Sequence, residues 1–565
     1  MDMMPTTQKP NSRKISTALL TCTILFVYGC GGGGSSNTGN TVTTGNGATG
    51  TAGNPLVGGT SGTSGTAGSG SGVAGAPDWA PGVFESSNSF EAMCLSPRAG
   101  VSAQTGNPFP DLPGSTPLEN HWLRSWTNET YLWYDEVTDR NPALYGTAAY
   151  FDLLKTDAVT GSGAPRDQFH FTYDTDVWEA LSASGVSAGY GFQITFLSSE
   201  IPYEIAIAYT EPGSPAATAG ISRGARILAI DGVSASVPTS QSDVDTLNAG
   251  LSPETLGETH SFTVQDLGAT GSRTVNLTSA SITSIPVQNV ASTDTATGKV
   301  GYILFNDHIA TAESQLITAF EQLQADSVSD LVLDLRYNGG GFLAIASEVA
   351  YMIAGAGQTN GEIFEQLVFN DKHPVFDPVT GELNDPLPFF DEALGFSATA
   401  GTALPSLNLP RVFILASSGT CSASESIINS LRGVGVEVIL IGDTTCGKPY
   451  GFYPTDNCGT TYFSIQFESE NAMGFSDYAD GFSPQNVSSA GAVSLPGCGA
   501  SDDFDNDLGD PNETMFATAL AYRDSGTCTV STKISPDGSV SISPTPTLTP
   551  KPAWLQNRVL DLPHE

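Results

Sequence analysis

A serine and a lysine in the second half of the chain have the residue types and the surroundings of a catalytic pair. Ser422 follows an apolar run (411–416) and a short turn, and it opens a stretch with helical spacing of apolar residues (422–431). We therefore expect it at a helix N-terminus directly after a strand, where free N–H groups can stabilise an oxyanion. Lys448 follows a second apolar run (436–441) and could take the proton of the serine where burial keeps its amine neutral.

The segments that precede this pair alternate between strands and helices. Apolar runs at 300–305 and 331–335 are each followed by a stretch with helical spacing, at 310–324 and 341–353. This alternation predicts an α/β layered core. The glycine-rich loop 337–341 comes at the carboxyl end of its strand, where such folds place ligands, so its backbone can closely approach a reacting carbonyl.

Three motifs carry the polar residues at the ends of these elements. They are Asp334-Leu335-Arg336-Tyr337-Asn338-Gly339-Gly340-Gly341, Ser422-Ala423-Ser424-Glu425 and Gly442-Asp443-Thr444-Thr445-Cys446-Gly447-Lys448. In this order they resemble the C-terminal processing (tail-specific) proteases, the S41 serine peptidases. The resemblance implies a ClpP/crotonase-like core, with Ser422 as nucleophile and Lys448 as general base. It also implies that Ala423 and Gly340 (or Gly341) donate to the oxyanion. A lone serine in such a turn is more often a helix N-cap, so the prediction depends on the three motifs together.

The segment after Lys448 departs from the pattern of this family. Many relatives read Gly-Lys-Gly-x-x-Gln, with the glutamine assisting the lysine, whereas here Pro449-Tyr450-Gly451-Phe452 follows. Another polar group, such as Gln466 on the next predicted strand, would have to orient Lys448. The alternative base is His308. The alternative function is a catalytically weak or inactive peptide-binding scaffold, but the intact motifs favour a peptidase.

The segment 185–285 alternates in the manner of short β-strands separated by glycine and proline. The runs that carry this pattern are 187–194, 212–221 and 224–232. They resemble a circularly permuted PDZ domain of bacterial proteases. The resemblance implies that an extended peptide adds to the domain as a strand and that a glycine-rich loop holds its terminal carboxylate. The candidates for that loop are Gly191, Phe192 and Gln193. The alternative is a PDZ-like fold whose groove is closed or merely structural.

The two ends of the chain differ from the part that we expect to fold. Residues 1–30 have a basic start and a short apolar stretch, and they end in Val27-Tyr28-Gly29-Cys30, which resembles a bacterial lipobox. The resemblance implies that Cys30 is lipidated; the alternative is an ordinary cleaved signal peptide. Residues 31–77 form a Gly/Ser/Thr-rich linker, and 531–565 form a Pro/Thr-rich tail. The parts predicted between them are a helical N-terminal domain (78–184), the PDZ-like domain (185–285) and the protease core (286–530).

The cysteines predict disulfide bonds. Of the eight cysteines, Cys22 would be removed with the signal and Cys30 would be lipidated, which leaves an even number in an exported protein. Close spacing favours the pairs Cys446–Cys458 and Cys498–Cys528, which leaves Cys94 with Cys421. We expect no metal or other cofactor, because no Cys/His cluster has zinc spacing. The alternative is calcium at the acidic loop 502–510, which lacks the glycine and glutamate positions of an EF-hand.

The composition limits the partners of the protein. Its formal net charge is −38, which opposes binding to nucleic acid or to an anionic membrane surface. We therefore expect contact with a membrane through the lipid anchor only, on the periplasmic or cell-surface side of a bacterium. The expected partners are protein or peptide substrates with free C-terminal tails. The sequence thus predicts a multidomain α+β protein that acts as an exported serine endopeptidase near the unstructured C-termini of proteins.

Overall fold

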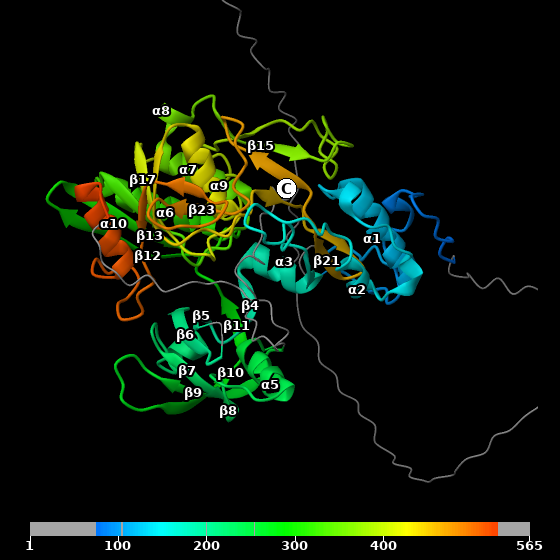
Figure 1. Cartoon of the computed structure of the whole chain (residues 1–565), viewed down its shortest axis with the longest axis horizontal. Helices are drawn as coiled ribbons and strands as arrows, with labels where there is room; N and C mark the ends of the chain where they lie inside the picture. The colour runs from blue at the N-terminus through cyan, green and yellow to red at the C-terminus, as the bar shows by residue number, and fades with distance from the viewer. Residues whose placement is uncertain (1–74, 103–105, 199–200, 254, 529–565) are drawn as a thin grey trace, which may run out of the picture. The chain divides into compact units, whose positions relative to one another are not determined.

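A mostly parallel β-sheet forms the centre of the second half of the chain (Figure 1). The structure, a computed structural model, describes residues 75–102, 106–198, 201–253 and 255–528. In spatial order the strands of this sheet are β12 (Val287–Thr295), β13 (Gly298–Phe305), β14 (Asp330–Asp334), β17 (Arg411–Ala416), β18 (Glu437–Gly442) and β25 (Gly497–Gly499). Neighbouring strands are parallel except β12 and β13, which are antiparallel. The carboxyl ends of the parallel strands therefore meet along one edge of the sheet.

Side chains on the two faces of this sheet contact different layers of helices. On β17, Val412 and Ile414 belong to one apolar cluster, whereas Phe413 and Leu415 belong to another. The helices of the first cluster are α6 (Ala312–Ala325), α7 (Leu343–Ala354) and α9 (Ala423–Gly433), and that of the second is α10 (Thr514–Ser525). Because successive side chains of a strand point to opposite faces, the sheet lies between two helical layers. The mixed α/β architecture predicted from the sequence is confirmed.

Residues 186–283 form a second group of strands with its own apolar core. In spatial order the strands of the larger sheet are β10 (Arg273–Thr278), β9 (Thr259–Gln265), β7 (Arg226–Ile230), β6 (Glu204–Thr210) and β5 (Phe192–Ser198), with β8 (Val233–Ser234) on β7. The remaining elements are α4 (Pro215–Thr218), α5 (Gln241–Leu251) and the pair β4 (Val186–Gly189) and β11 (Ala280–Thr283). Ile207, Ile227 and Phe262 are among the buried side chains of its separate cluster. This segment therefore folds around an interior of its own.

The N-terminal part of the described chain is mainly helical and is joined to the second half of the protein. Its elements are η1 (Ser87–Ser89), β1 (Met93–Cys94), β2 (Leu112–Pro113), α1 (Thr116–Thr130), η2 (Tyr134–Glu136), η3 (Pro142–Leu144), α2 (Thr147–Phe151), β3 (Phe171–Asp174) and α3 (Thr175–Ser184). β3 pairs with β21 (Thr460–Phe463), and Trp122 and Trp126 of α1 pack against Tyr462 of β21. Because this part shares a sheet with the core, the domain limits at 184 and 285 remain predictions.

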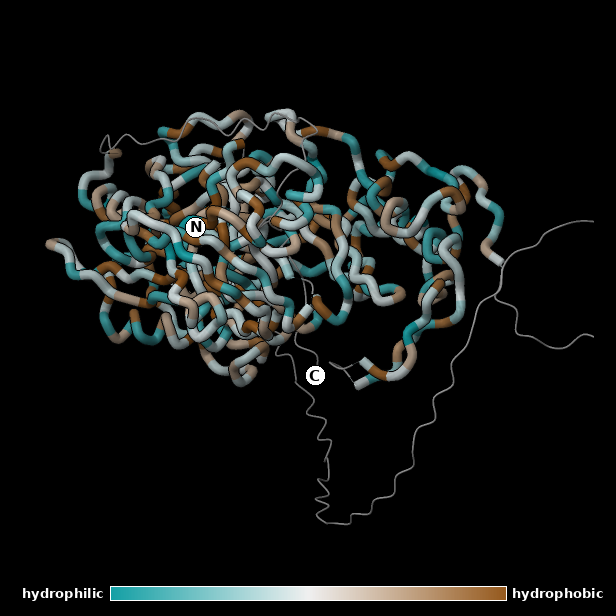
Figure 2. Tube along the Cα trace, turned by 90° about the horizontal axis from the view of Figure 1, so that it is seen from below, coloured by the Kyte–Doolittle hydropathy of each residue, from teal (hydrophilic) through white to brown (hydrophobic). Residues whose placement is uncertain are grey.

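Short strands border the central sheet. One small sheet contains, in spatial order, β16 (Leu387–Pro388), β15 (Ile363–Phe369), β22 (Phe467–Glu470) and β19 (Tyr450–Gly451). The other elements are β20 (Thr455–Asn457), which pairs with β21, the pair β23 (Phe482–Pro484) and β24 (Val493–Leu495), and the helix α8 (Ala356–Thr359). Figure 2 shows hydrophobic positions, in brown, and hydrophilic positions, in teal, alternating along the trace, with teal positions frequent on the outer loops.

The disulfide bonds differ from the predicted pairing. Within the described residues the bonds are Cys94–Cys458, Cys421–Cys446 and Cys498–Cys528. The predicted pair Cys498–Cys528 is confirmed, whereas the predicted pairs Cys446–Cys458 and Cys94–Cys421 are wrong. Cys421 and Cys446 follow the carboxyl ends of the adjacent parallel strands β17 and β18, and their Cα atoms are 5.2 Å apart. Spacing along the chain did not indicate this, because the order of strands in a sheet is not local information.

Several predictions concern residues outside the described part of the chain. They are the signal peptide (1–30) with Cys30, the linker as far as residue 74, and the tail (531–565). Among the helices of the described ranges, none combines the length and the apolar character that a membrane crossing requires.

A buried pair of glutamates fixes a loop between α7 and β17. Glu313 Oε1 accepts hydrogen bonds from the N–H groups of Leu394 and Gly395 at 2.8 and 2.9 Å, and Glu313 Oε2 accepts from Ser397 N–H at 2.6 Å. Glu348 Oε1 also faces Leu394 N–H, at 3.2 Å. Burial, together with the charge of Glu313, raises the pKa of Glu348 to about 9. The loop is therefore held by one carboxylate and one neutral carboxyl group.

We expect Glu348→Gln to remove a pH dependence of stability. In the unfolded chain a glutamate ionises near pH 4.3, whereas folded Glu348 keeps its proton up to about pH 9. The wild type therefore loses stability as the pH rises between these values, by up to about 1.4 kcal/mol per pH unit. Glutamine cannot ionise, so urea unfolding at about pH 5 and about pH 8.5 should show the variant gaining on the wild type at the higher pH. The exposed Glu321→Gln of α6 is the control, and a pH-independent difference for Glu348→Gln would contradict the assignment.

Candidate active site

Ser422 occupies the turn between β17 and α9. It is the N-cap of α9, so its predicted position at a helix N-terminus directly after a strand is confirmed. Its backbone has φ 60° and ψ −119°, a conformation that costs a non-glycine residue about 1–3 kcal/mol. The side chain is buried, and its Oγ has no hydrogen-bond partner among the described residues. A serine in a strained strand-to-helix turn is typical of a nucleophile.

Lys448 lies in the loop after β18 and is fully buried. Its Nζ lies 4.1 Å from the ring centroid of Phe452 and 5.0 Å from that of Phe169. Phe452 follows it closely in the sequence, whereas Phe169 comes from the N-terminal part of the chain, just before β3. The amine is therefore enclosed by two aromatic rings and shielded from water. The N-terminal part thus contributes to the environment of the candidate base.

The carboxylate of Glu425 joins the serine segment to the lysine segment. Its Oε2 accepts hydrogen bonds from Ser422 N–H at 3.0 Å and from Lys448 N–H at 2.8 Å. Its Oε1 accepts from Gly447 N–H at 2.8 Å and from Thr445 Oγ1 at 2.5 Å. Burial raises the pKa of Glu425, and these hydrogen bonds oppose that effect. One buried carboxylate therefore sets the distance between the two backbone segments that carry Ser422 and Lys448.

Glu425 is the residue whose role the sequence reasoning did not assign. Its position three residues after Ser422 is the capping-box position, which explains its bond to Ser422 N–H. The bonds to Gly447 and Lys448 are long-range and depend on the placement of β17 beside β18. Cys421, Glu425 and Cys446 also have the mutual spacing of metal ligands. The two sulfurs are joined in a disulfide, however, and the carboxylate oxygens already accept the hydrogen bonds described above.

The glycine-rich loop lies directly against the nucleophile. Gly340 has φ +108°, and a Cβ atom there would come to 2.8 Å from Ser422 Cβ and 3.0 Å from Ala423 N. Gly340 N–H donates to Asn338 Oδ1 at 3.0 Å, so this group is engaged within its own loop. Ala423 is the first residue of α9, where N–H groups lack intrahelical acceptors and carry the positive end of the helix dipole. The structure thus brings the predicted oxyanion residues Gly340 and Ala423 to Ser422.

His308 also lies beside this loop. The backbone N–H of His308 donates to Gly340 O at 3.1 Å, and the ring Nδ1 lies 2.9 Å from Asn338 Oδ1. Because Asn338 Oδ1 is an acceptor, Nδ1 carries the proton of the ring. Burial lowers the pKa of the imidazole to about 3, so the ring is neutral and a weak base at neutral pH. His308 therefore has the environment of a residue that holds the loop through Asn338.

Gln466, which was considered as a replacement for the missing family glutamine, is buried on the segment before β22. The side-chain Oε1 of Gln466 accepts a hydrogen bond from Tyr453 N–H at 2.7 Å, and the backbone N–H of Gln466 donates to Gly451 O at 2.9 Å. The side-chain oxygen is therefore bound to the backbone that follows Lys448. Through these bonds Gln466 holds the segment after the lysine in place.

The Asp-Leu-Arg motif anchors an ion-pair network behind the loop. Arg336 is fully buried and pairs with Asp334 at 2.8 Å, with Glu513 at 2.8 Å and with Asp502 at 2.7 Å. Asp502 also pairs with Arg223 of the segment before β7, at 2.5 Å. The acidic loop 502–510, considered above as a calcium site, thus supplies a carboxylate to two guanidinium groups. The network connects the 186–283 segment to the base of the glycine-rich loop.

The predicted peptide-binding residues lie at the start of β5, the edge strand of its sheet. Gly191 has φ +77°, and a Cβ there would come to 2.2 Å from Ser214 Cβ. Its carbonyl accepts from Glu211 N–H at 2.7 Å. Phe192 packs against Phe262, and Gln193 Nε2 donates to Ile194 O at 3.2 Å. The structure therefore brings these three residues together at one end of an edge strand.

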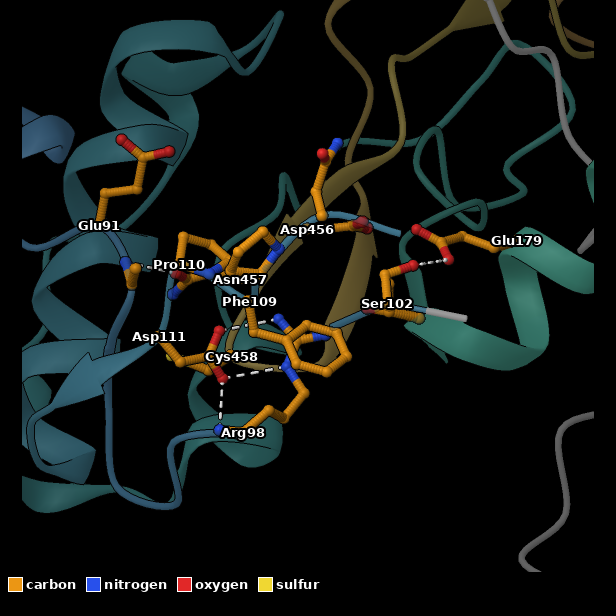
Figure 3. A pocket seen from close by; sticks show the side chains of 14 residues that line it. Glu91, Arg98, Ser102, Phe109, Pro110, Asp111, Glu179, Asp456, Asn457 and Cys458 are labelled. Atoms are coloured by element: carbon orange, nitrogen blue, oxygen red, sulfur yellow. Dashed lines mark hydrogen bonds and ion pairs between the residues drawn. The ribbon is translucent and has the colours of Figure 1, made fainter. Parts of the chain in front are cut away.

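A separate cavity of about 190 Å³ lies between the N-terminal segment, α3 and β20 (Figure 3). Arg98 and Asp111 form an ion pair at 2.8 Å on its wall. Burial raises the pKa of Glu179 and of Asp456, which also line it. Neither Ser422 nor Lys448 is among the lining residues, so the cavity is distinct from the candidate catalytic site.

The motifs fall within a recognised protein family. Residues 299–452, which contain the glycine-rich loop, Ser422 and Lys448, match the model of peptidase family S41. This part of the chain therefore matches a peptidase S41 domain. The matched range begins in β13 and ends just after β19, so it covers the part of the fold that positions the candidate site.

Two curated proteins that are similar to this chain are named as C-terminal processing peptidases. The chain is 30% identical over 275 residues to a carboxyl-terminal-processing protease of Picosynechococcus sp., with 47% of this chain and 56% of the relative covered. It is 27% identical over 281 residues to a chloroplastic C-terminal processing peptidase of Tetradesmus obliquus, covering 47% and 52%. The chain thus spans about half the length of these curated relatives. A solved structure from Bacteroides fragilis, described as a candidate S41 protease, has a TM-score of 0.53 at 25% identity and covers 74% of this chain and 98% of that one.

We expect Gly340→Ala to lower kcat about 100-fold without unfolding the protein. The new Cβ would be forced against Ser422 Cβ at 2.8 Å and would occupy a backbone conformation of φ +108°. Steady-state kinetics together with the thermal midpoint would measure this. Gly357→Ala is the control, because a Cβ on this helical residue meets nothing within 4 Å. Unchanged kcat for Gly340→Ala would show that the loop does not form part of the catalytic site.

Proposed function

We propose that this protein is an exported serine endopeptidase that hydrolyses peptide bonds near unstructured C-termini of proteins. The observation that carries the proposal is the bridge from Glu425 Oε2 to the N–H groups of Ser422 and Lys448. It supports a site in which a nucleophile and an amine base are held by one buried group. The names of the two curated relatives support the same reaction class.

The proposed reaction uses groups of this chain alone. The neutral amine of Lys448 takes the proton of Ser422 Oγ as the oxygen attacks the carbonyl carbon of the scissile bond. Ala423 N–H donates to the resulting oxyanion, and a second donor comes from Gly340 or Gly341. The Gly340 N–H would first have to leave Asn338 Oδ1. The ammonium of Lys448 then protonates the leaving amine, and a water molecule, deprotonated by Lys448, hydrolyses the acyl-enzyme.

Recognition of the substrate tail is assigned to the PDZ-like segment 185–285. Its edge strand β5 offers backbone groups to which an extended peptide can add as a further strand. The turn at Gly191, Phe192 and Gln193 would hold the terminal carboxylate at the start of that strand. Export through the signal at 1–30, with a lipid anchor at Cys30, belongs to the same proposal. The disulfide bonds support it, because they persist in oxidising compartments.

We expect the protein to prefer a substrate with a free terminal carboxylate. An unstructured fluorogenic peptide with an apolar C-terminus should be cut with a kcat/KM about 10-fold higher than the same peptide amidated at its C-terminus, since a charge-assisted hydrogen bond contributes about 1.5–3 kcal/mol. Gly191→Ala should raise KM for the free acid, because its Cβ would clash with Ser214.

Gly213→Ala is the matched control for this experiment. Its φ of +76° is nearly that of Gly191, at +77°, but a Cβ there meets nothing within 4 Å. Both variants therefore carry the same backbone strain, and only one blocks the turn. Equal KM values for the acid and the amide would contradict tail recognition while leaving hydrolysis itself in place. Binding of the free tail without any cleavage would favour the peptide-binding scaffold.

A further inference from the structure

A disulfide bond lies between the two segments that carry the proposed catalytic residues. Cys421 directly precedes Ser422, and Cys446 stands two residues before Lys448. Cys421 is fully buried, whereas Cys446 is partly buried. Cys446 N–H also donates to Thr420 O at 3.0 Å. The bond thus joins the nucleophile turn to the base loop at the point where they meet.

The same disulfide lies against the carboxylate that bridges Ser422 and Lys448. Cys446 Sγ is 3.4 Å from Glu425 Oε2, the atom that accepts from both Ser422 N–H and Lys448 N–H. A disulfide sulfur has no proton to donate. A free Cys446 thiol has one, and it could donate to Glu425 Oε2 in competition with the two backbone groups.

We propose that the Cys421–Cys446 disulfide positions Ser422 and Lys448 for catalysis, and that its reduction lowers the peptidase activity. This inference rests on the proposed function. The bond keeps the two segments in register, and it leaves both lone-pair sites of Glu425 Oε2 to Ser422 and Lys448. Backbone bonds and Glu425 still connect the segments after reduction, so the fold persists while the geometry of the pair relaxes.

The reductive step is an ordinary thiol–disulfide exchange with a dithiol. A thiolate of the dithiol attacks Cys446 Sγ, the less buried sulfur, so that a mixed disulfide forms and Cys421 leaves as a thiolate that takes a proton. The second thiolate of the dithiol then attacks its own sulfur in the mixed disulfide and releases Cys446, which is also protonated. The dithiol is oxidised to a cyclic disulfide, and the protein gains two thiols.

The other disulfides provide a control for general destabilisation. Cys498–Cys528 closes a loop of sequence separation 30, close to the separation of 25 for Cys421–Cys446. In the chain-entropy model, loops of similar length give similar stabilisation. Cys498 lies in β25 and Cys528 beyond α10, so this bond does not join the catalytic segments. A matched pair of double variants therefore separates catalytic positioning from stability.

The experiment compares the purified wild type, Cys421→Ala/Cys446→Ala and Cys498→Ala/Cys528→Ala on the fluorogenic peptide. We expect the first double variant to lose about 10- to 100-fold in kcat with KM little changed, as a misplaced pair would. The second should keep kcat within about twofold, because distant sites act independently. Both should lose thermal stability to a similar degree. The rate at which a fluorophosphonate labels Ser422 should fall only in the first.

A second arm uses the wild type, in case a variant does not fold. Mild dithiol treatment, with the reduced cysteines identified by alkylation and mass spectrometry, should lower kcat in proportion to reduction of Cys421–Cys446. Reoxidation should restore it. Unchanged kcat after full reduction of this pair, or an equal loss in the second double variant, would overturn the inference. If the oxidised wild type cuts no substrate above the level of Ser422→Ala, the proposed function fails instead.

Discussion

Ser422→Ala and Lys448→Ala should each lower kcat for peptide hydrolysis by at least about 10⁴-fold, as expected for residues that act as a unit. In the proposed mechanism, alanine at 422 removes the attacking oxygen, and alanine at 448 removes the amine that takes its proton. Lys448→Arg should be equally inactive, because a guanidinium does not give up its proton in a protein. Steady-state kinetics on the fluorogenic peptide, with thermal midpoints for each variant, would measure these effects.

Two substitutions serve as controls for this pair. Ser430→Ala removes a buried hydroxyl from α9, the helix that begins after Ser422. Lys372→Ala removes a lysine whose amine donates to the side chain of Asn128 in the N-terminal part of the chain. Both should keep kcat close to that of the wild type. Activity retained by Lys448→Ala would move the role of the base elsewhere, and His308→Gln would then be the next variant. If Lys448→Arg retained activity, Lys448 would contribute only its positive charge and would not act as the general base.

Glu425→Ala should lower kcat about 10²- to 10³-fold and destabilise the protein by several kcal/mol. Four donors, the N–H groups of Ser422, Gly447 and Lys448 and the hydroxyl of Thr445, lose their shared acceptor. Each buried donor left without an acceptor costs about 1–3 kcal/mol, and the two catalytic segments are free to separate. The kinetic loss should appear in kcat rather than in KM, because the proposed tail-binding residues 191–193 lie in another segment of the chain.

Glu425→Gln tests whether the charge and the acceptors matter, rather than the volume of the side chain. The NH₂ group of the glutamine would face the N–H and hydroxyl donors that Glu425 accepts from. We therefore expect the Glu425→Gln variant to be nearly as inactive as Glu425→Ala. Urea unfolding and the fluorophosphonate labelling rate of Ser422 would report stability and geometry separately. Glu437→Gln, on the exposed start of β18, is the matched control. Wild-type kcat in Glu425→Gln would mean that the bridge does not position the pair.

Much of the core could be predicted from local patterns. The strand Arg411–Ala416 agrees with the predicted 411–416, and α9 begins one residue after the predicted helix start. Apolar periodicity decides such elements because a buried strand or helix face needs apolar side chains at fixed intervals. The place of Ser422 between strand and helix follows from the same local information.

Contacts between distant segments could not be predicted in this way. The pairing of Cys421 with Cys446 was missed because it depends on β17 and β18 being neighbours in the sheet. The link from β3 to β21, which joins the N-terminal part to the core, gave no local signal either. Gly340 was assigned to the oxyanion, but its N–H donates to Asn338, a bond set by the folded loop.

The sequence by itself determined the α/β elements, the turn at Ser422 and the presence of a lysine after the next strand. These features depend on short-range periodicity and on turn residues, which act within one element. Only the tertiary structure decided that one carboxylate, Glu425, holds both segments and that a disulfide crosses between them. Parallel strands from separate parts of the chain bring their carboxyl ends to one edge, and the contacts made there depend on the strand order of the whole sheet.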